Sequence, residues 1–183
     1  MSKMPYLSLS AFLLLLDQLS KWVVTEYLIR IVVEKPDPQS LGFFEWFLNT
    51  PPRLSFVSID ILPFFNLVMV WNQGISFGLF NDGGEMNAYI LSGLSLVISV
   101  VFLIWLFRSE SKMQNIGIAF VIAGAFGNII DRLRFGAVID FLDFHIAGFH
   151  WPAFNVADSC IFIGVLLLIV KSLFFETPQK DAT

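Results

Sequence analysis

The chain is poor in the residues on which many sites of soluble proteins depend. Only 14% of its 183 residues are charged, and the net charge is -4. It has a single cysteine, Cys160, which excludes an internal disulfide and is expected to be a small apolar side chain within a helix. No cluster of basic residues resembles a surface that follows phosphates, so we expect no binding of nucleic acid.

The sequence also lacks the motifs of several enzyme classes. Its two histidines, His145 and His150, have no cysteine cluster to complete a dedicated zinc site. Neither histidine belongs to a recognisable Ser/His/Asp order, which argues against serine hydrolases. No phosphate-binding loop or dinucleotide fingerprint is present, which argues against nucleotide-dependent enzymes. We therefore predict no metal and no cofactor, and we interpret the two histidines as loop residues at a water interface.

Apolar sequence is what the chain has in abundance. Hydrophobic residues make up 56% of it, with 21 Phe and 5 Trp, and the mean hydropathy is +0.75. Apolar runs of about 20 residues are typical of membrane-spanning helices. We predict a mainly α membrane protein in which residues 1–183 form one integral membrane domain with four transmembrane helices, at about 5–29, 87–107, 113–133 and 152–175. A cleaved signal peptide is the alternative for the first run, but no small-residue cleavage site follows it.

The segment between the first two spans is predicted to form a small extracytoplasmic β-rich cradle, at about residues 34–80. Residues 59–80 are apolar enough for a fifth span, but their prolines, asparagines and glycines interrupt any helical face. Residues 67–71 favour a strand, so we predict a strand–turn–strand element over residues 64–79. Upstream, residues 34–58 mix Phe and Trp with charges, which suits the headgroup layer of a membrane. An interfacial loop without chemistry is the alternative for this upstream segment.

The distribution of Lys and Arg predicts the orientation. Four spans put both termini on one side, where the basic residues lie in short segments. Because short cytoplasmic segments are enriched in Lys and Arg, we predict that both termini are cytoplasmic.

Four acids lie in or between two strongly apolar stretches: Asp131, Asp140, Asp143 and Asp158. An ionised carboxylate near a bilayer is costly, so such acids usually face a protein interior or a wet cavity and carry function. Asp140 and Asp158 come from separate segments that also contain amide or guanidinium donors. We therefore predict a site built on paired carboxylates.

Polar residues on the third span recur with helical spacing. Gly124, Asn128 and Arg132 are four residues apart, and Asp131 is predicted to lie on the same helical face. The alternative is a seam between two helices, closed by the glycine and the asparagine.

Three further motifs have two interpretations each. Asn155 precedes Asp158 by three residues, which suits either a site or local capping of the fourth helix. Asp17 and Lys21 are spaced for an ion pair within the first helix, and we interpret them as structural. Residues 72–78 are interpreted as a turn that presents the amide of Asn72 to the site, with a plain hairpin turn as the alternative.

Together these segments resemble lipoprotein signal peptidase (signal peptidase II), the intramembrane aspartyl peptidase family of bacteria. The resemblance covers residues 17–164, and its pieces occur in the family's order. They are DQLSK at 17–21, FNL at 65–67, NQGISFG at 72–78, GNIIDR at 127–132, VIDF at 138–141 and FNVAD at 154–158.

The resemblance implies roles for particular residues. The acids of the family's V-x-D-F and F-N-x-A-D motifs form its catalytic dyad, which corresponds here to Asp140 and Asp158. Residues implied to line the pocket or position substrate are Asn72, Gly124, Asn128, Arg132 and Asn155. Residues implied to be supporting structure are Asp131, Asp17 and Lys21. The family fold has four transmembrane helices, an extracytoplasmic strand-rich cradle and a periplasmic helix, and residues 34–58 are longer than is usual for it.

By resemblance, the chain is an aspartic endopeptidase that removes signal peptides from prolipoproteins. It would cut just before a diacylglyceryl-modified cysteine, with a water activated by the dyad. The expected partners are these substrates and membrane lipid, and we expect a monomer in the bacterial cytoplasmic (inner) membrane with its active site near the outer face. The alternatives from other classes are a proton- or ion-coupled transporter and a non-enzymatic assembly factor.

Overall fold

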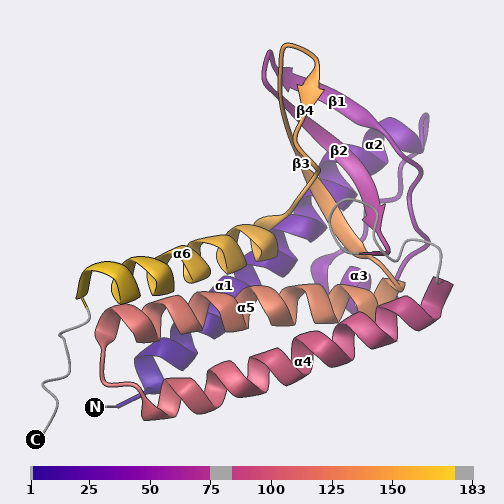
Figure 1. The fold of residues 1–183 in the computed structure, drawn as a ribbon. Helices are drawn as coiled ribbons and strands as arrows, with labels where there is room; N and C mark the ends of the chain where they lie inside the picture. Colours follow the sequence, from indigo (N-terminus) through magenta and orange to yellow (C-terminus); the bar gives the residue numbers. More distant parts are fainter. Residues whose placement is uncertain (1, 75–83, 176–183) are drawn as a thin grey trace, which may run out of the picture.

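Within the part of the chain that the structure describes, four helices are long and apolar enough to cross a membrane, which confirms the predicted fold class. The computed structural model describes residues 2–74 and 84–175 (Figure 1). The first span is continuous from α1 (Met4–Val23) through the π-helix η1 (Val24–Ile29) into α2 (Arg30–Val33). The other three are α4 (Gly84–Arg108), α5 (Lys112–Phe135) and α6 (Val156–Phe175).

Helix α5 is the centre of the bundle. It packs against α1, α4 and α6, and Figure 1 shows it between α4 and α6 with α1 crossing behind. Ser111 caps its first turn, accepting a hydrogen bond from the Gln114 backbone N–H. Gly136 ends it in the left-handed conformation, at φ 66°, which a residue without Cβ adopts at little cost. Because α5 is surrounded on three sides, its polar residues face protein rather than lipid.

A four-stranded antiparallel sheet projects from the end of the bundle where α5 ends and α6 begins (Figure 1). Its strands are β1 (Ser58–Leu62), β2 (Phe65–Asn72), β3 (Val138–Ile146) and β4 (Phe149–His150), in the order β1-β2-β3-β4. Strand β3 follows α5 after a two-residue turn and leads into α6, so the sheet is tied to two spans at once.

The predicted strand–turn–strand element has a different layout from the one expected. β2 pairs with β1 upstream and with β3 downstream, and a tight turn at Pro63 and Phe64 joins β1 to β2. Proline suits this position because its ring fixes φ at a value that turns use. Residues 75–79 of the predicted element lie outside the described residues.

The segment of residues 34–58 is not an interfacial loop throughout. It contains the helix α3 (Phe43–Asn49), and Trp46 of that helix is 1% exposed within a core formed with residues of the sheet and of α5. The Arg134 guanidinium lies 4.2 Å from the centre of the Trp46 ring and donates to the Trp46 carbonyl at 2.6 Å. Trp46 is therefore a core residue rather than a membrane-surface residue, whereas Phe44 is exposed.

Candidate active site

The two acids predicted to act together lie at the junction of α5, β3 and α6. Asp140 is on β3, opposite Val70 of β2. Asp158 is in the first turn of α6. Asp140 is 1% exposed and Asp158 is partly exposed, so the two carboxylates differ in their access to water.

Three asparagine amides donate hydrogen bonds to the two carboxylates, and two of them link one acid to the other. Asn72 Nδ2 donates to Asp140 Oδ2 at 2.9 Å, and Asn155 Nδ2 donates to Asp140 Oδ1 at 2.7 Å. Asn128 Nδ2 donates to Asp158 Oδ1 at 2.7 Å, and Asn128 Oδ1 lies 3.3 Å from Asn155 Nδ2. The chain of contacts therefore runs from one acid to the other through neutral donors.

Asn155 caps α6 and belongs to this chain at the same time. Its Oδ1 accepts from the Asp158 backbone N–H at 2.9 Å, while Asp158 Oδ2 accepts from the Asn155 N–H at 3.3 Å. This reciprocal pair is a capping box. The two interpretations of the Asn155–Asp158 spacing are thus not exclusive, because the cap fixes both residues beside Asp140.

The environment of Asp140 favours its neutral form. Burial is the main cause, followed by the negative charge of Asp158, and together they raise the pKa of Asp140 to about 7. Hydrogen bonds from Asn72 and Asn155 and the positive charge of Lys21 act in the opposite direction. A carboxyl group with such a pKa can hold or release a proton near neutral pH.

A cavity of about 200 Å³ opens beside Asp158. Its polar lining is Asn72, Asn128, Arg132 and Asp158 together with Ser95 of α4, and the apolar residues from α4 are Leu91, Leu94 and Ile98. Arg132 Nη2 donates to the Gly74 carbonyl at 3.4 Å, which keeps the guanidinium at the rim. The cavity therefore offers hydrogen-bonding groups on one side and hydrocarbon on the other.

Gly124 lies one helical turn below Asn128, where α5 meets α6. A Cβ at this position would overlap the Ala157 carbonyl, so the two helices can come this close only because the residue is glycine. Its role here is to set the separation of α5 and α6 just beneath the two acids.

Asp131 does not share the cavity with Asn128 and Arg132, so the prediction of one face for all four residues of the third span is wrong. Successive helical residues point about 100° apart, and this rotation turns Asp131 toward α1. There Lys21 Nζ lies 2.7 Å from Asp131 Oδ2 and 2.8 Å from Asp17 Oδ2. The predicted Asp17–Lys21 ion pair is therefore present, and Asp131 joins it. Asp17, Lys21 and Asp131 are each at most 1% exposed. We call these three residues the ion cluster.

Sequence reasoning missed two residues next to the ion cluster. Gln18 Nε2 donates to Asp17 Oδ2 and to Asp131 Oδ1, both at 3.1 Å. Arg134 Nη1 donates to Gln18 Oε1 at 3.5 Å. The signal for Gln18 was a polar residue inside an apolar run, within the DQLSK motif at residues 17–21.

Asp143 belongs to a different group of residues at the far end of the sheet. The His150 ring N–H donates to Asp143 Oδ2 at 2.9 Å, and Asn66 Nδ2 donates to the same oxygen at 3.1 Å. The histidines lie directly opposite each other on β3 and β4, with ring centres 4.7 Å apart, and are not loop residues.

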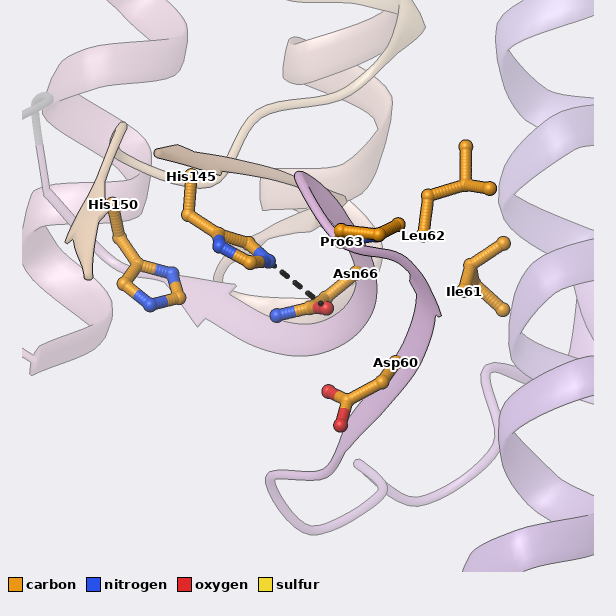
Figure 2. Close-up of a pocket in the computed structure, with 7 residues that line it drawn as sticks. All are labelled: Asp60, Ile61, Leu62, Pro63, Asn66, His145 and His150. Atoms are coloured by element: carbon orange, nitrogen blue, oxygen red, sulfur yellow. Dashed lines mark hydrogen bonds between the residues drawn. The ribbon is translucent and has the colours of Figure 1, made fainter. Parts of the chain in front are cut away.

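Figure 2 shows the open pocket of about 610 Å³ that these histidines line. His145 contacts Asn66, and Asp60 stands apart from both imidazoles. Within residues 2–74 and 84–175, no three His, Cys, Asp or Glu side chains are grouped so that they could hold a metal ion. The pocket does not include Asp140 or Asp158.

Four apolar spans with a pair of acids at one end define a multi-pass membrane protein with a candidate aspartate site. Over residues 9–174 the sequence matches the family described as "Signal peptidase (SPase) II". It is 40% identical over 179 residues to the lipoprotein signal peptidase of Alteromonas mediterranea, which covers 97% of this chain and 84% of that protein. It is 37% identical to that of Coxiella burnetii, covering 96% of this chain and 93% of that protein.

A solved structure described as "Bacterial membrane enzyme structure by the in meso method at 2.3 A resolution" has a similar fold. Its TM-score is 0.65 at 26% identity, and the match covers 98% of this chain and 93% of that one. The chain therefore belongs to the signal peptidase II family, a family of proteases, and the resemblance found in the sequence is confirmed.

Proposed function

We propose that this protein removes the signal peptides of lipoproteins with Asp140 and Asp158 as its catalytic dyad. The observation that carries the proposal is the amide chain between the two carboxylates, which places acids from β3 and α6 in one hydrogen-bonded unit. Family membership supplies the substrate class, since the relatives at 32–40% identity are lipoprotein signal peptidases.

The environments of the two acids suggest different roles. Asp140, with a pKa of about 7, is the member that holds the proton at neutral pH. Asp158 accepts hydrogen bonds from Asn128 and from the Asn155 backbone, and it lies in the first turn of α6, where the helix dipole favours negative charge. These contacts suit Asp158 to be the member that activates water.

This assignment gives a balanced reaction. Asp158 takes a proton from a water molecule as the water oxygen attacks the scissile carbonyl carbon, while Asp140 donates its proton to the carbonyl oxygen. The tetrahedral intermediate then collapses, the C–N bond breaks, and the leaving nitrogen receives the proton that Asp158 had taken. The hydroxyl proton of the intermediate returns to Asp140, which restores the starting state.

The cavity next to Asp158 suits a lipidated substrate. The side chains of Leu94 and Ile98 are 54% and 42% exposed and line the cavity from α4, so its apolar wall continues onto the outer surface of that helix. We infer that a prolipoprotein enters from the bilayer, with the diacylglyceryl group of its cysteine against this wall. Arg132 and Asn128 would then meet the polar backbone near the cleavage site.

The orientation follows from the distribution of charge. Lys3, Arg108 and Lys112 lie at the end of the bundle opposite the dyad, and Lys3 donates to the Ser109 carbonyl there. Since basic residues favour the cytoplasmic side, we infer that both termini are cytoplasmic and that the dyad lies near the outer face of the bacterial inner membrane.

A cleavage assay in detergent tests the proposal. Purified protein is mixed with a prolipoprotein peptide bearing a diacylglyceryl-modified cysteine, and products are identified by mass spectrometry, with the unlipidated peptide as control. Wild type should cut only the lipidated peptide, just before the cysteine, without any ion gradient. Asp140→Asn, Asp158→Asn and the double variant should be equally inactive, because the two carboxylates act as one unit. Substantial cleavage by either single variant would contradict the dyad, and absence of wild-type cleavage would favour a transporter or an assembly factor.

A further inference from the structure

The ion cluster contacts the backbone immediately before each acid of the proposed dyad. Asp131 Oδ2 accepts from the Ile139 N–H at 3.1 Å, and Ile139 directly precedes Asp140. Asp17 Oδ1 accepts from the Ala157 N–H at 2.9 Å, and Ala157 directly precedes Asp158. We propose that Asp17 and Asp131 are positioning residues, which hold the two catalytic carboxylates in register through these backbone contacts. The proposal rests on the proposed function of the dyad.

Each contact satisfies a backbone group that would otherwise be difficult to pair. Ala157 is the second residue of α6, and the first N–H groups of a helix have no partner within it. Asp17 supplies the partner from α1, a different helix. Asp131 reaches forward from α5 to β3, across the turn at Gly136 where the chain changes direction. Asp17 and Asp131, which we call the two anchors, thus fix the start of α6 and the start of β3 relative to the same part of the bundle.

Lys21 and Gln18 join the two anchors into one body. The Lys21 ammonium lies within 2.8 Å of a carboxylate oxygen of Asp17 and of Asp131, and Gln18 donates to both carboxylates. All four side chains are buried. Since a movement of one carboxylate would break its contact with the shared cation, Asp17 and Asp131 cannot shift independently. The positions of Ile139 and Ala157 are therefore coupled.

The same helix offers a matched control. Glu26 and Arg30 form a second buried i,i+4 ion pair, with N–O distances of 2.8 and 2.9 Å. Glu26 accepts a hydrogen bond from the Leu41 backbone N–H at 2.9 Å, so it also holds a backbone segment in place. Leu41 is far in sequence from Asp140 and Asp158. A variant of Glu26 therefore shows what the loss of a buried charge does by itself.

The pH profile provides a readout that a merely structural role would not move. The charges that act on Asp140 come from three helices, namely Lys21 on α1, Arg132 on α5 and Asp158 on α6. If an anchor is lost and the carboxylates separate, the repulsion by Asp158 falls and Asp140 gives up its proton at lower pH. Replacing an anchor carboxylate by an amide also removes a negative charge nearby, which acts in the same direction.

The experiment compares Asp17→Asn, Asp131→Asn and Glu26→Gln with wild type in the detergent assay with the lipidated peptide. Both anchor variants should lower kcat by about 10- to 100-fold with KM within about 2-fold, because misplaced catalytic groups slow the chemical step. In both anchor variants, the alkaline limb of the kcat–pH profile should move to lower pH. Glu26→Gln should lower the melting temperature while keeping kcat, KM and the limb at wild-type values.

Rates are normalised to the folded fraction, measured by circular dichroism. If the anchor variants do not fold, Gln18→Leu decides, since it removes the amide that joins both anchors without changing any charge, and it should lower kcat in the same way at unchanged KM. The proposal would be overturned if the anchor variants fold and, like Glu26→Gln, keep kcat, KM and the alkaline limb at wild-type values. If the anchor variants do not fold, the same result for the kcat of Gln18→Leu would overturn it. If wild type does not cleave while folded, the proposed function fails and the positioning role falls with it.

Discussion

Two pairs of aspartates meet at the same junction of helices, and their carboxylates have different kinds of partner. Asp17 and Asp131 share the Lys21 ammonium, which is in direct contact with both carboxylates. Asp140 and Asp158 receive hydrogen bonds from neutral asparagine amides instead. Both arrangements satisfy the carboxylate oxygens, but only the first supplies a countercharge in direct contact.

The difference explains why one pair is suited to structure and the other to chemistry. A carboxylate in direct contact with a buried cation is held in place by that cation. The buried carboxyl of Asp140, held by amides beside a second acid, instead has its pKa raised to about 7, within reach of neutral pH. The adjacent residues Asp131 and Arg132 of α5 mark the boundary, because Asp131 faces the ion cluster and Arg132 faces the cavity.

Removal of the shared cation should have the largest effect on stability. Lys21→Met would leave two carboxylates buried together without a countercharge, and breaking a buried ion pair from one side typically costs about 3–5 kcal/mol. We expect a large drop in melting temperature in detergent at pH 7, measured by differential scanning fluorimetry. Asp140→Asn, which removes a charge from the other pair, should show no such drop. Equal stability of Lys21→Met and wild type would mean that the ion cluster is not a stabilising unit.

The proposed dyad should instead weaken the fold as pH rises. The pKa of Asp140 is about 7 in the folded protein, against about 3.9 in an unfolded chain. Between these values the folded state holds a proton that the unfolded state has released, so stability falls with increasing pH and levels off above about 7. Asp140→Asn lacks this loss, and at pH 8 it should be more stable than wild type by about 2–4 kcal/mol.

The measurement is chemical denaturation of both proteins at pH 5 and at pH 8. The advantage of Asp140→Asn should be smaller at pH 5, where wild-type Asp140 still holds its proton. An advantage that is the same at both pH values would show that Asp140 does not titrate in this range.

A substitution at Gly124 should disturb the contact between α5 and α6 beneath the proposed dyad, through packing alone. The added methyl of Gly124→Ala meets the Ala157 carbonyl, and relieving such an overlap typically costs about 1–3 kcal/mol. Gly93→Ala on α4 is the matched control, because a Cβ there has no atom within 4 Å, and alanine favours the helix by about 1 kcal/mol. Thermal unfolding should therefore move in opposite directions for the two variants. A stabilised Gly124→Ala would mean that α5 and α6 separate without loss.

The proximity of Asp140 and Asp158 could be predicted from the sequence, whereas the surroundings of this proposed dyad could be predicted only in part. Asp140, Asp158 and their asparagines lie in short motifs whose spacing is visible in the chain. Strand β3 was missed because Asp140 and Asp143 interrupt the alternation by which a strand is usually detected. The side of α5 that Asp131 faces depends on where α1 packs, which helical spacing does not specify. The anchors on the Ile139 and Ala157 backbones depend on tertiary structure, because a backbone N–H has no signature in sequence.

The smallest effect concerns the amide that holds Asp140 from β2. Asn72 Nδ2 donates to Asp140 Oδ2 and stabilises its ionised form, so Asn72→Ala should raise the pKa of Asp140 above 7. A hydrogen bond to a charged group contributes about 1.5 kcal/mol at the lower end of its usual range, which corresponds to roughly one pH unit. The alkaline limb of the kcat–pH profile should therefore move to higher pH, opposite to the shift expected for Asp131→Asn. Asn66→Ala, on the same strand but bonded to Asp143, should leave the limb in place. A downward shift in Asn72→Ala would contradict the view that neutral amides, rather than a cation, hold this acid poised between its two protonation states.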